Sequence, residues 1–193
     1  MGTRQQQKAK RRQDILETAL DLFITKGYSD TRISDIAEKA GMSMGLMFYY
    51  FESKAKLYEE LVRIGISGPL SMLQIDSSEP LGFFEAAAGF ILKILNENSF
   101  SAKMFVLMEQ AGFTAAIPET VQEQLKELNI LEATVPIIEA GQACGQIRDG
   151  DPLALSVLFW QALTGVALLK ALHPNTPVPE PEWLIDCLRR KQA

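Results

Sequence analysis

Twelve residues, from Ser43 to Lys54, carry the side chains of this chain that are best suited to contact another molecule. They read SMGLMFYYFESK, so a run of large apolar and aromatic groups is followed closely by a cation. The tyrosine hydroxyls and the lysine ammonium could donate hydrogen bonds to phosphate oxygens. The apolar groups could contact the methyl group that thymine presents in the major groove. The alternative is that all of the apolar groups belong to a protein core.

Charge is divided unevenly along the chain. The formal net charge is −5, which by itself argues against nucleic-acid binding. Residues 1–58 nevertheless hold ten lysines and arginines against seven acids, whereas residues 59–193 hold nine against seventeen. A mildly basic front joined to an acidic body is expected if only the front touches phosphate. A basic tail that is merely solvated would give the same pattern.

Patterns for catalysis, metal binding or membrane insertion are weak in this sequence. His173 is the one histidine, and the two cysteines, Cys144 and Cys187, lie far apart, so a zinc site is not expected. We recognise no Ser/His/Asp set, paired catalytic acids or glycine-rich phosphate loop. No run of 18 apolar residues predicts a transmembrane helix, and no apolar stretch follows the basic N-terminus. We therefore expect a cytoplasmic protein that is not an enzyme, needs no cofactor or metal, and does not bind membranes.

Hydrophobic periodicity predicts an all-α chain of about nine helices, because apolar residues recur at helical spacing in nearly every segment. Gly27 and Gly41 end two of them, and Pro118 and Pro152 fall where helices begin. Pro136 is expected to kink the longest one. The predicted helices cover residues 8–26, 31–40, a stretch begun at Ser43, 53–66, 80–97, 100–112, 118–145, 151–172 and 180–191.

The second and third of these helices are short and joined by a turn that contains glycine, which is typical of a helix-turn-helix. Ala37 is small where two helices would cross, and Gly41 lies four residues later at the turn. Met42 and Met47 are apolar where the third helix must pack. Because a random helical hairpin can match this spacing, the flanking residues decide its meaning.

The segment ILETALDLFITKGYSDTRISDIAEKAGMSMGLMFYYFESKAKLYEEL, from Ile15 to Leu61, resembles the DNA-binding domain of the TetR (tetracycline repressor) family. Many positions agree in order and without gaps. The rest of the chain is similar to that family in helix count and in the segment GQIRDGDPLALS, a common entry to its dimerisation helix. The resemblance implies an N-terminal three-helix helix-turn-helix DNA-binding domain, residues 1–60, and a C-terminal helical effector-binding and dimerisation domain, residues 61–193.

The third helix is expected to divide its side chains between a core and the major groove. Helical spacing turns Met47 and Phe51 inward, while the N-terminal part of the helix enters the groove. Met44, Leu46 and Phe48 depart from the residues usual in the family, and Met44 and Leu46 cannot hydrogen-bond to base edges. The residues expected to contact DNA are Thr31, Ser34, Ser43, Met44, Gly45, Leu46, Phe48, Tyr49, Tyr50 and Lys54. Simple helix capping is an equal alternative for Thr31.

The acidic body carries two further predicted sites. Methionine and phenylalanine at helical spacing suggest an effector pocket, although such a stripe is more often plain core. The residues predicted to bind the effector are Phe90, Met104, Phe105, Met108 and Glu109. The helix over 151–172 is apolar around most of its circumference and is expected to lie against a second subunit or within one chain. The residues predicted at a dimer interface are Phe159, Trp160 and Gly165.

These observations favour a homodimeric DNA-binding transcriptional regulator. The preferred interpretation is a repressor that a small apolar or amphipathic effector releases from double-stranded operator DNA. One alternative is a regulator controlled by a protein partner, with no small ligand. The other is a helical enzyme or lipid-binding protein.

Overall fold

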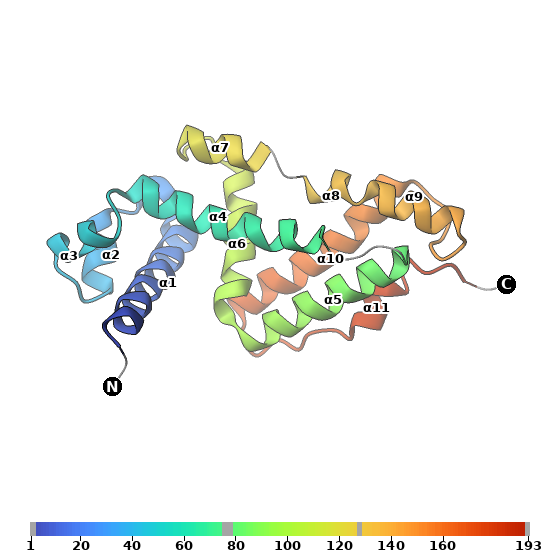
Figure 1. Ribbon diagram of the computed structural model, residues 1–193, viewed down its shortest axis with the longest axis horizontal. Helices are drawn as coiled ribbons and strands as arrows, with labels where there is room; N and C mark the ends of the chain where they lie inside the picture. Colours follow the sequence, from blue (N-terminus) through green and yellow to red (C-terminus); the bar gives the residue numbers. More distant parts are fainter. Residues whose placement is uncertain (1–2, 75–78, 127–128, 192–193) are drawn as a thin grey trace. The chain divides into compact units, whose positions relative to one another are not determined.

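The computed structural model describes residues 3–74, 79–126 and 129–191, and these are helical apart from loops and one isolated β-bridge between Ile147 and Arg189 (Figure 1). The predicted all-α fold is confirmed. In chain order the helices are α1 (Arg4–Asp30), α2 (Ile33–Lys39), α3 (Met44–Tyr50), α4 (Lys54–Met72), α5 (Pro80–Glu97), α6 (Ser99–Phe113), α7 (Glu119–Lys126), α8 (Ile130–Ala133), α9 (Val135–Ala143), α10 (Pro152–Leu172) and α11 (Pro181–Ile185).

Several helix boundaries differ from the sequence prediction. The helix predicted over 53–66 continues through Pro69 to Met72, and the one predicted over 180–191 ends at Ile185. In two further places, capping residues set the boundary where periodicity is weak. The basic N-terminus is helical from Arg4, since Thr3 and Gln6 form a reciprocal capping box there. The single helix predicted over 118–145 is divided into α7, α8 and α9. Asn129 caps α8 by accepting from the N–H groups of the next turn, and Pro136 lies in the first turn of α9. Pro136 therefore helps to start a helix rather than kinking one.

The chain forms two compact units. The head unit contains residues 1–65 and 106–125, and the body unit contains residues 66–105 and 126–193. The proposed functional division into residues 1–60 and 61–193 differs from these units, because residues 61–65, the end of α6 and α7 up to Leu125 belong to the head unit.

The head unit is built on the apolar face of α1, against which α2 packs, and α3 packs in turn against α2. The start of α4 meets α1 where Tyr58 packs edge to face on Phe23. Leu20, Ile36 and Met47 are completely buried there. The turn between α2 and α3 requires Gly41, whose φ of 64° is a left-handed conformation that glycine adopts at little cost. The turn and the buried side chains together fix the direction of α3.

Two side-chain hydrogen bonds attach α6 and α7 to the rest of the head unit. Gln110 Nε2 of α6 donates to the carbonyl oxygen of Ile24 in α1 at 3.1 Å. Thr120 Oγ1 of α7 donates to Glu59 Oε1 of α4 at 2.7 Å. The last turns of α6 are thus held directly against the helices that position α3.

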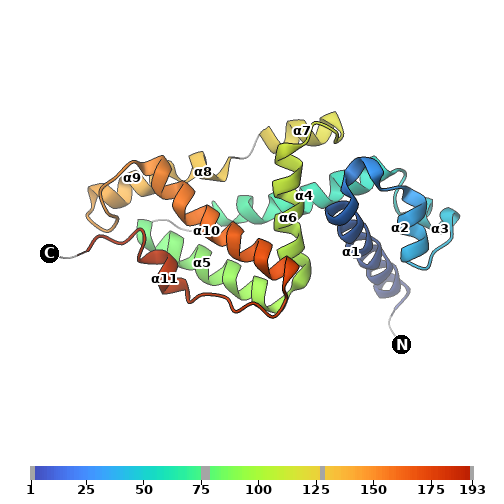
Figure 2. The same ribbon diagram turned by 180° about the vertical axis from the view of Figure 1, so that it is seen from behind.

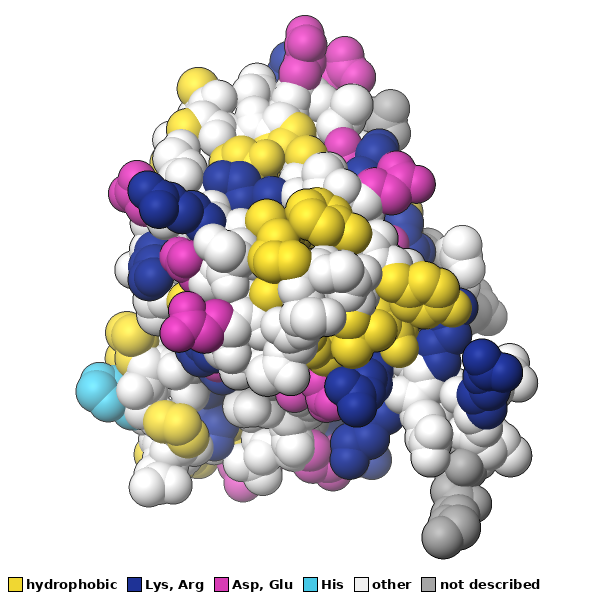
Figure 3. Space-filling view, turned by 90° about the vertical axis from the view of Figure 1, so that its left-hand side faces the viewer, with side chains coloured by type: hydrophobic (Ala, Val, Ile, Leu, Met, Phe, Trp, Pro, Cys, Tyr) yellow, Lys and Arg dark blue, Asp and Glu magenta, His cyan; other side chains and the backbone are white. Residues whose placement is uncertain are grey.

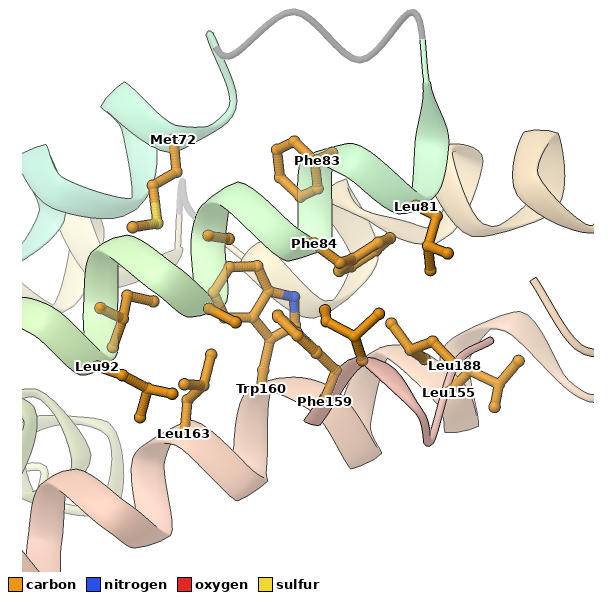
Figure 4. Packing of buried hydrophobic residues seen from close by; sticks show 14 of the residues in the cluster. Met72, Leu81, Phe83, Phe84, Leu92, Leu155, Phe159, Trp160, Leu163 and Leu188 are labelled. Carbon is orange, nitrogen blue, oxygen red and sulfur yellow. The ribbon is translucent and has the colours of Figure 1, made fainter. Parts of the chain in front are cut away.

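The body unit has its core between α5 and α10, with α9 and α11 packed beside them in both views (Figures 1 and 2). Phe84 of α5 and Phe159 of α10 meet edge to face with ring centroids 4.9 Å apart, and Trp160 extends from α10 toward α5 (Figure 4). Trp160 Nε1 donates to Thr134 Oγ1 at 3.0 Å, and that hydroxyl lies 2.9 Å from Ser156 Oγ. Buried polar groups that are hydrogen-bonded in this way fix how α10 docks on α8 and α9.

Candidate nucleic-acid interface

The short helix α3 exposes more apolar and aromatic surface than its packing needs. Ser43 caps the helix by accepting from Leu46 N–H at 3.3 Å. Met47 and, just after the helix, Phe51 are buried, as predicted. Met44, Phe48 and Tyr49 remain 38%, 48% and 65% exposed. The interpretation that all of the apolar groups belong to the core is therefore wrong.

Gly45 lies on the same exposed face of α3. A Cβ atom added there would meet no protein atom within 4 Å, and the backbone is ordinary right-handed helix. Neither packing nor a special backbone angle requires glycine at this position, and glycine inside a helix costs about 1 kcal/mol relative to alanine. A glycine that the fold does not require is expected where another molecule approaches the backbone closely.

Cations from the start of α1 lie beside α3. Lys8 Nζ is 5.0 Å from the centroid of the Tyr49 ring, and the Arg12 guanidinium is 5.0 Å from that of Phe51. Figure 3 faces the side of the molecule that carries α2 and α3 in Figure 1, and it shows hydrophobic side chains (yellow) next to lysines and arginines (dark blue). An apolar surface bordered by cations suits a DNA groove flanked by phosphates.

The other residues predicted on this surface differ in their accessibility. Ser34 is exposed at the start of α2, while Leu46 and Tyr50 are half-buried. Tyr50 packs edge to face on Tyr49 with ring centroids 5.2 Å apart. Thr31 is completely buried, and its hydroxyl donates to the carbonyl oxygen of Gly27 at 2.7 Å, so that hydroxyl is not available to a phosphate. Thr31 does not cap α2 either, because the N-cap position is Arg32.

Lys54 has a structural partner that the sequence analysis did not foresee. Its Nζ donates to the carbonyl oxygen of Tyr28 at 2.7 Å and lies 4.2 Å from the centroid of the Tyr28 ring. Partial burial lowers the pKa of the Lys54 ammonium below its ordinary value. Lys54 therefore connects the start of α4 to the end of α1, whatever it contributes to phosphate binding.

The residues predicted to bind an effector do not all fall in one unit. Met104 is buried in the body unit, where Phe105 packs at the edge of the core, and Phe90 is 55% exposed. Met108 and Glu109 are half-buried and belong to the head unit. The helix α6 passes from one unit to the other between Phe105 and Val106.

Two of the three residues predicted at a dimer interface lie in the core of their own chain. Phe159 is fully buried and Trp160 nearly so, because they face α5 and α9 rather than solvent. Gly165 is exposed, and a Cβ atom there would meet nothing within 4 Å. Exposed apolar residues share its face of α10 at helical spacing, namely Leu158, Leu169 and Leu172, with Val157 at the edge of that face.

The helix α10 is apolar enough in composition to raise the question of membrane insertion. By length and composition, α10 is long and apolar enough to cross a membrane, and it alone meets that test within residues 3–74, 79–126 and 129–191. Its buried half packs into the body core, and helices in protein cores commonly pass the same test. Over the same part of the chain, no group of three or more His, Cys, Asp and Glu side chains could hold a metal ion.

Sequence reasoning missed Lys8 and Gln110 as individual residues. The basic residues at the N-terminus indicated only that this end of the chain touches phosphate. Lys8 lies over Tyr49 because the helix α1 begins at Arg4, and this start was not predicted. Nothing in the sequence pairs Gln110 with the Ile24 carbonyl, since backbone acceptors carry no residue-specific signal.

Comparison with known proteins gives a consistent picture. A family model described as "Bacterial regulatory proteins, tetR family" matches residues 15–61. The transcriptional repressor KstR2 of Mycolicibacterium smegmatis is 37% identical over 166 residues, covering 84% of this chain and 80% of the relative. The transcriptional regulator RutR of Escherichia coli K12 is 27% identical over 200 residues, covering 95% and 92%. The solved structure of the ketosteroid transcriptional regulator KstR2 of Mycobacterium tuberculosis superposes with a TM-score of 0.67 at 16% identity, covering 94% and 96%.

Proposed function

Because this chain belongs to the tetR family of bacterial regulatory proteins and is a DNA-binding transcriptional regulator, we propose that it represses its target genes until a small apolar or amphipathic effector releases it from operator DNA. The relatives named as repressors support the sign of the regulation. The observation that carries the DNA-binding surface is the exposed face of α3, on which Met44, Phe48 and Tyr49 surround a glycine that the fold does not need.

Two kinds of contact are proposed for this surface. Side chains at the N-terminal end of α3 lie in the major groove, and Tyr50, Ser34 and the α1 cations face phosphates. Lys8 is added to the predicted set because its ammonium is already beside Tyr49. Thr31 leaves that set because its hydroxyl is buried and bonded within the protein.

The protein acts as a homodimer, as expected of this family, and we place the interface on the exposed apolar face of α10 around Gly165. Leu158 and Leu169 on that face are about half exposed. Burying such a row against its symmetry mate removes apolar surface from water, and a glycine allows the two helices to approach closely. Two heads in one dimer would then read two half-sites in successive major grooves.

The effector is proposed to act through α6. Met104 and Phe105 lie in the part of α6 that belongs to the body unit, and Gln110 lies about one and a half turns later in the head unit. A ligand that displaced Met104 or Phe105 would shift or rotate α6 and alter the Gln110 contact with α1. Such a ligand weakens DNA binding only if its affinity differs between the DNA-bound arrangement of α6 and the shifted one.

The cellular location and the kind of activity follow from DNA binding. Operator DNA lies in the bacterial cytoplasm, where this protein is proposed to work. Regulation requires binding rather than catalysis, and no enzymatic activity is proposed.

A mobility-shift assay with the DNA upstream of its own gene tests the proposal. The wild-type chain is expected to retard this DNA in the presence of excess non-specific competitor. Tyr49→Ala is expected to weaken the shift strongly, and Trp183→Ala, which removes an exposed aromatic residue of the body unit, is the matched control. Equal shifts by the two variants would contradict the assignment of α3.

The effector arm of the proposal is tested separately by calorimetry. A small molecule that raises the melting temperature should bind more weakly when operator DNA is present, by the same factor by which it weakens DNA binding. A Gln110→Ala variant should bind that molecule normally but lose most of this mutual effect. Equal coupling in Gln110→Ala and wild type would remove α6 from the proposed route.

A further inference from the structure

The exposed face of α3 is poor in groups that can hydrogen-bond to bases. Of the seven residues of α3, only Tyr49 and Tyr50 carry a polar side-chain group. The hydroxyl of Ser43 before it already accepts the Leu46 N–H. The helix therefore offers no arginine or lysine for guanine and no asparagine or glutamine for adenine, which are the side chains that make paired hydrogen bonds to those bases.

What α3 does offer is an apolar ridge beside a notch. Met44 and Phe48 are one turn apart and lie side by side on the helix, as do Gly45 and Tyr49. Met44 and Phe48 are both well exposed, and Gly45 leaves open space where a side chain would stand. Against this surface, the polar atoms of a base edge would be covered by carbon atoms and could form no hydrogen bonds. A base that presents an apolar group to the ridge would avoid this loss.

Thymine is the base that presents such a group, because its C5-methyl projects into the major groove. Guanine and cytosine opposite the same ridge would lose hydrogen bonds to water and gain none. From the exposed side chains of α3, we infer that the preferred DNA site of this protein presents thymine methyl groups to Met44 and Phe48. This inference rests on the proposed binding of α3 to DNA and specifies the chemistry that is read there.

The experiment begins with selection of bound duplexes from a random pool by the full-length protein. Each thymine of the enriched sequence is then replaced singly by deoxyuridine, which removes the methyl group and leaves base pairing intact. At the thymines opposite Met44 and Phe48, affinity should fall about fourfold per methyl group, the equivalent of about 0.8 kcal/mol. The remaining thymines act as internal controls and should show little change.

Variants of the two side chains assign the effect. Met44→Ala and Phe48→Ala alter exposed residues, so both should fold, and circular dichroism verifies this. Each variant should bind the selected thymine-containing site more weakly and should no longer distinguish deoxyuridine from thymine at one of the sensitive positions. If the methyl effect persists unchanged in both variants, another part of the protein must contact the methyl group, and the inference is overturned.

The remaining outcomes are also decisive. An enriched site at which no deoxyuridine replacement changes affinity would overturn methyl recognition while leaving DNA binding intact. A pool in which no sequence is enriched would contradict the proposed sequence-specific binding itself, and the inference would fall with it.

Discussion

Lys54 Nζ lies 2.7 Å from the carbonyl oxygen of Tyr28 and 4.2 Å from the centre of its ring. The contact joins the first turn of α4 to the last turn of α1, where unpaired backbone carbonyls favour a cation. From the sequence, this lysine is expected to bind phosphate. Its position shows that it also holds together two of the helices that support α3.

Replacing Lys54 by alanine should therefore lower the free energy of unfolding by about 1–2 kcal/mol, since a charge-assisted hydrogen bond is lost. Lys56→Ala is the matched control, because Lys56 forms an exposed ion pair with Glu59 at 2.7 Å, and this variant should leave stability nearly unchanged. Urea denaturation measures both. Equal stabilities would show that the Tyr28 contact is not important in solution.

Lys54 can be tested for phosphate binding in the same variant. If its ammonium also neutralises a phosphate, Lys54→Ala should reduce the slope of log affinity against log salt by about one unit. A purely structural lysine would leave that slope unchanged and weaken binding only through the loss of stability.

Glu60 makes the stability of the head unit depend on pH. Hydrogen bonds from Arg63 and Arg12, at 2.8 and 2.7 Å, lower the pKa of Glu60 to about 2. Because the folded pKa lies below the unfolded value, this contribution is fully present above about pH 4.3 and is lost as pH falls toward about 2.

Glu60→Gln should therefore be less stable than wild type by roughly 1–3 kcal/mol at pH 7, and the difference should shrink steadily below pH 4. The exposed Glu123 of α7 supplies the control Glu123→Gln. Denaturation curves at pH 7, 5, 4 and 3 give the answer, and a stability difference that does not depend on pH would contradict the ion-pair explanation.

Neighbouring residues on α10 should have opposite roles. Trp160→Ala removes a buried ring and its hydrogen bond to Thr134, and should cost about 3–5 kcal/mol of stability. Leu158→Glu places a charge on the exposed face and should instead convert the dimer to monomers with little loss of helical content. Light scattering at micromolar concentration and thermal melting separate the two effects. A dimeric, fully stable Leu158→Glu variant would move the interface away from this face.

The helices α2 and α3 of the head unit could be predicted from the sequence because each signal there is local. Gly41 marks the turn, Ser43 caps α3, and the spacing of Met47 and Phe51 identifies the buried side. The predictions failed for α10, where apolar residues surround the helix and periodicity cannot distinguish a core face from an interface face. They also failed for Thr31 and did not foresee the structural contact of Lys54, because the partners of both residues are backbone carbonyls that no residue type reveals.

The most direct test of the account is the paired measurement of stability and DNA affinity in Gly45→Ala. The added methyl group meets no protein atom, so the free energy of unfolding should rise by about 0.5–1 kcal/mol. If α3 lies close against the major groove, the same methyl group should weaken binding to the selected DNA site by about tenfold or more. Gly89→Ala, an equally open helical position in the body unit, should not weaken DNA binding. A more stable Gly45→Ala protein that binds DNA as tightly as wild type would contradict the placement of α3 in the groove.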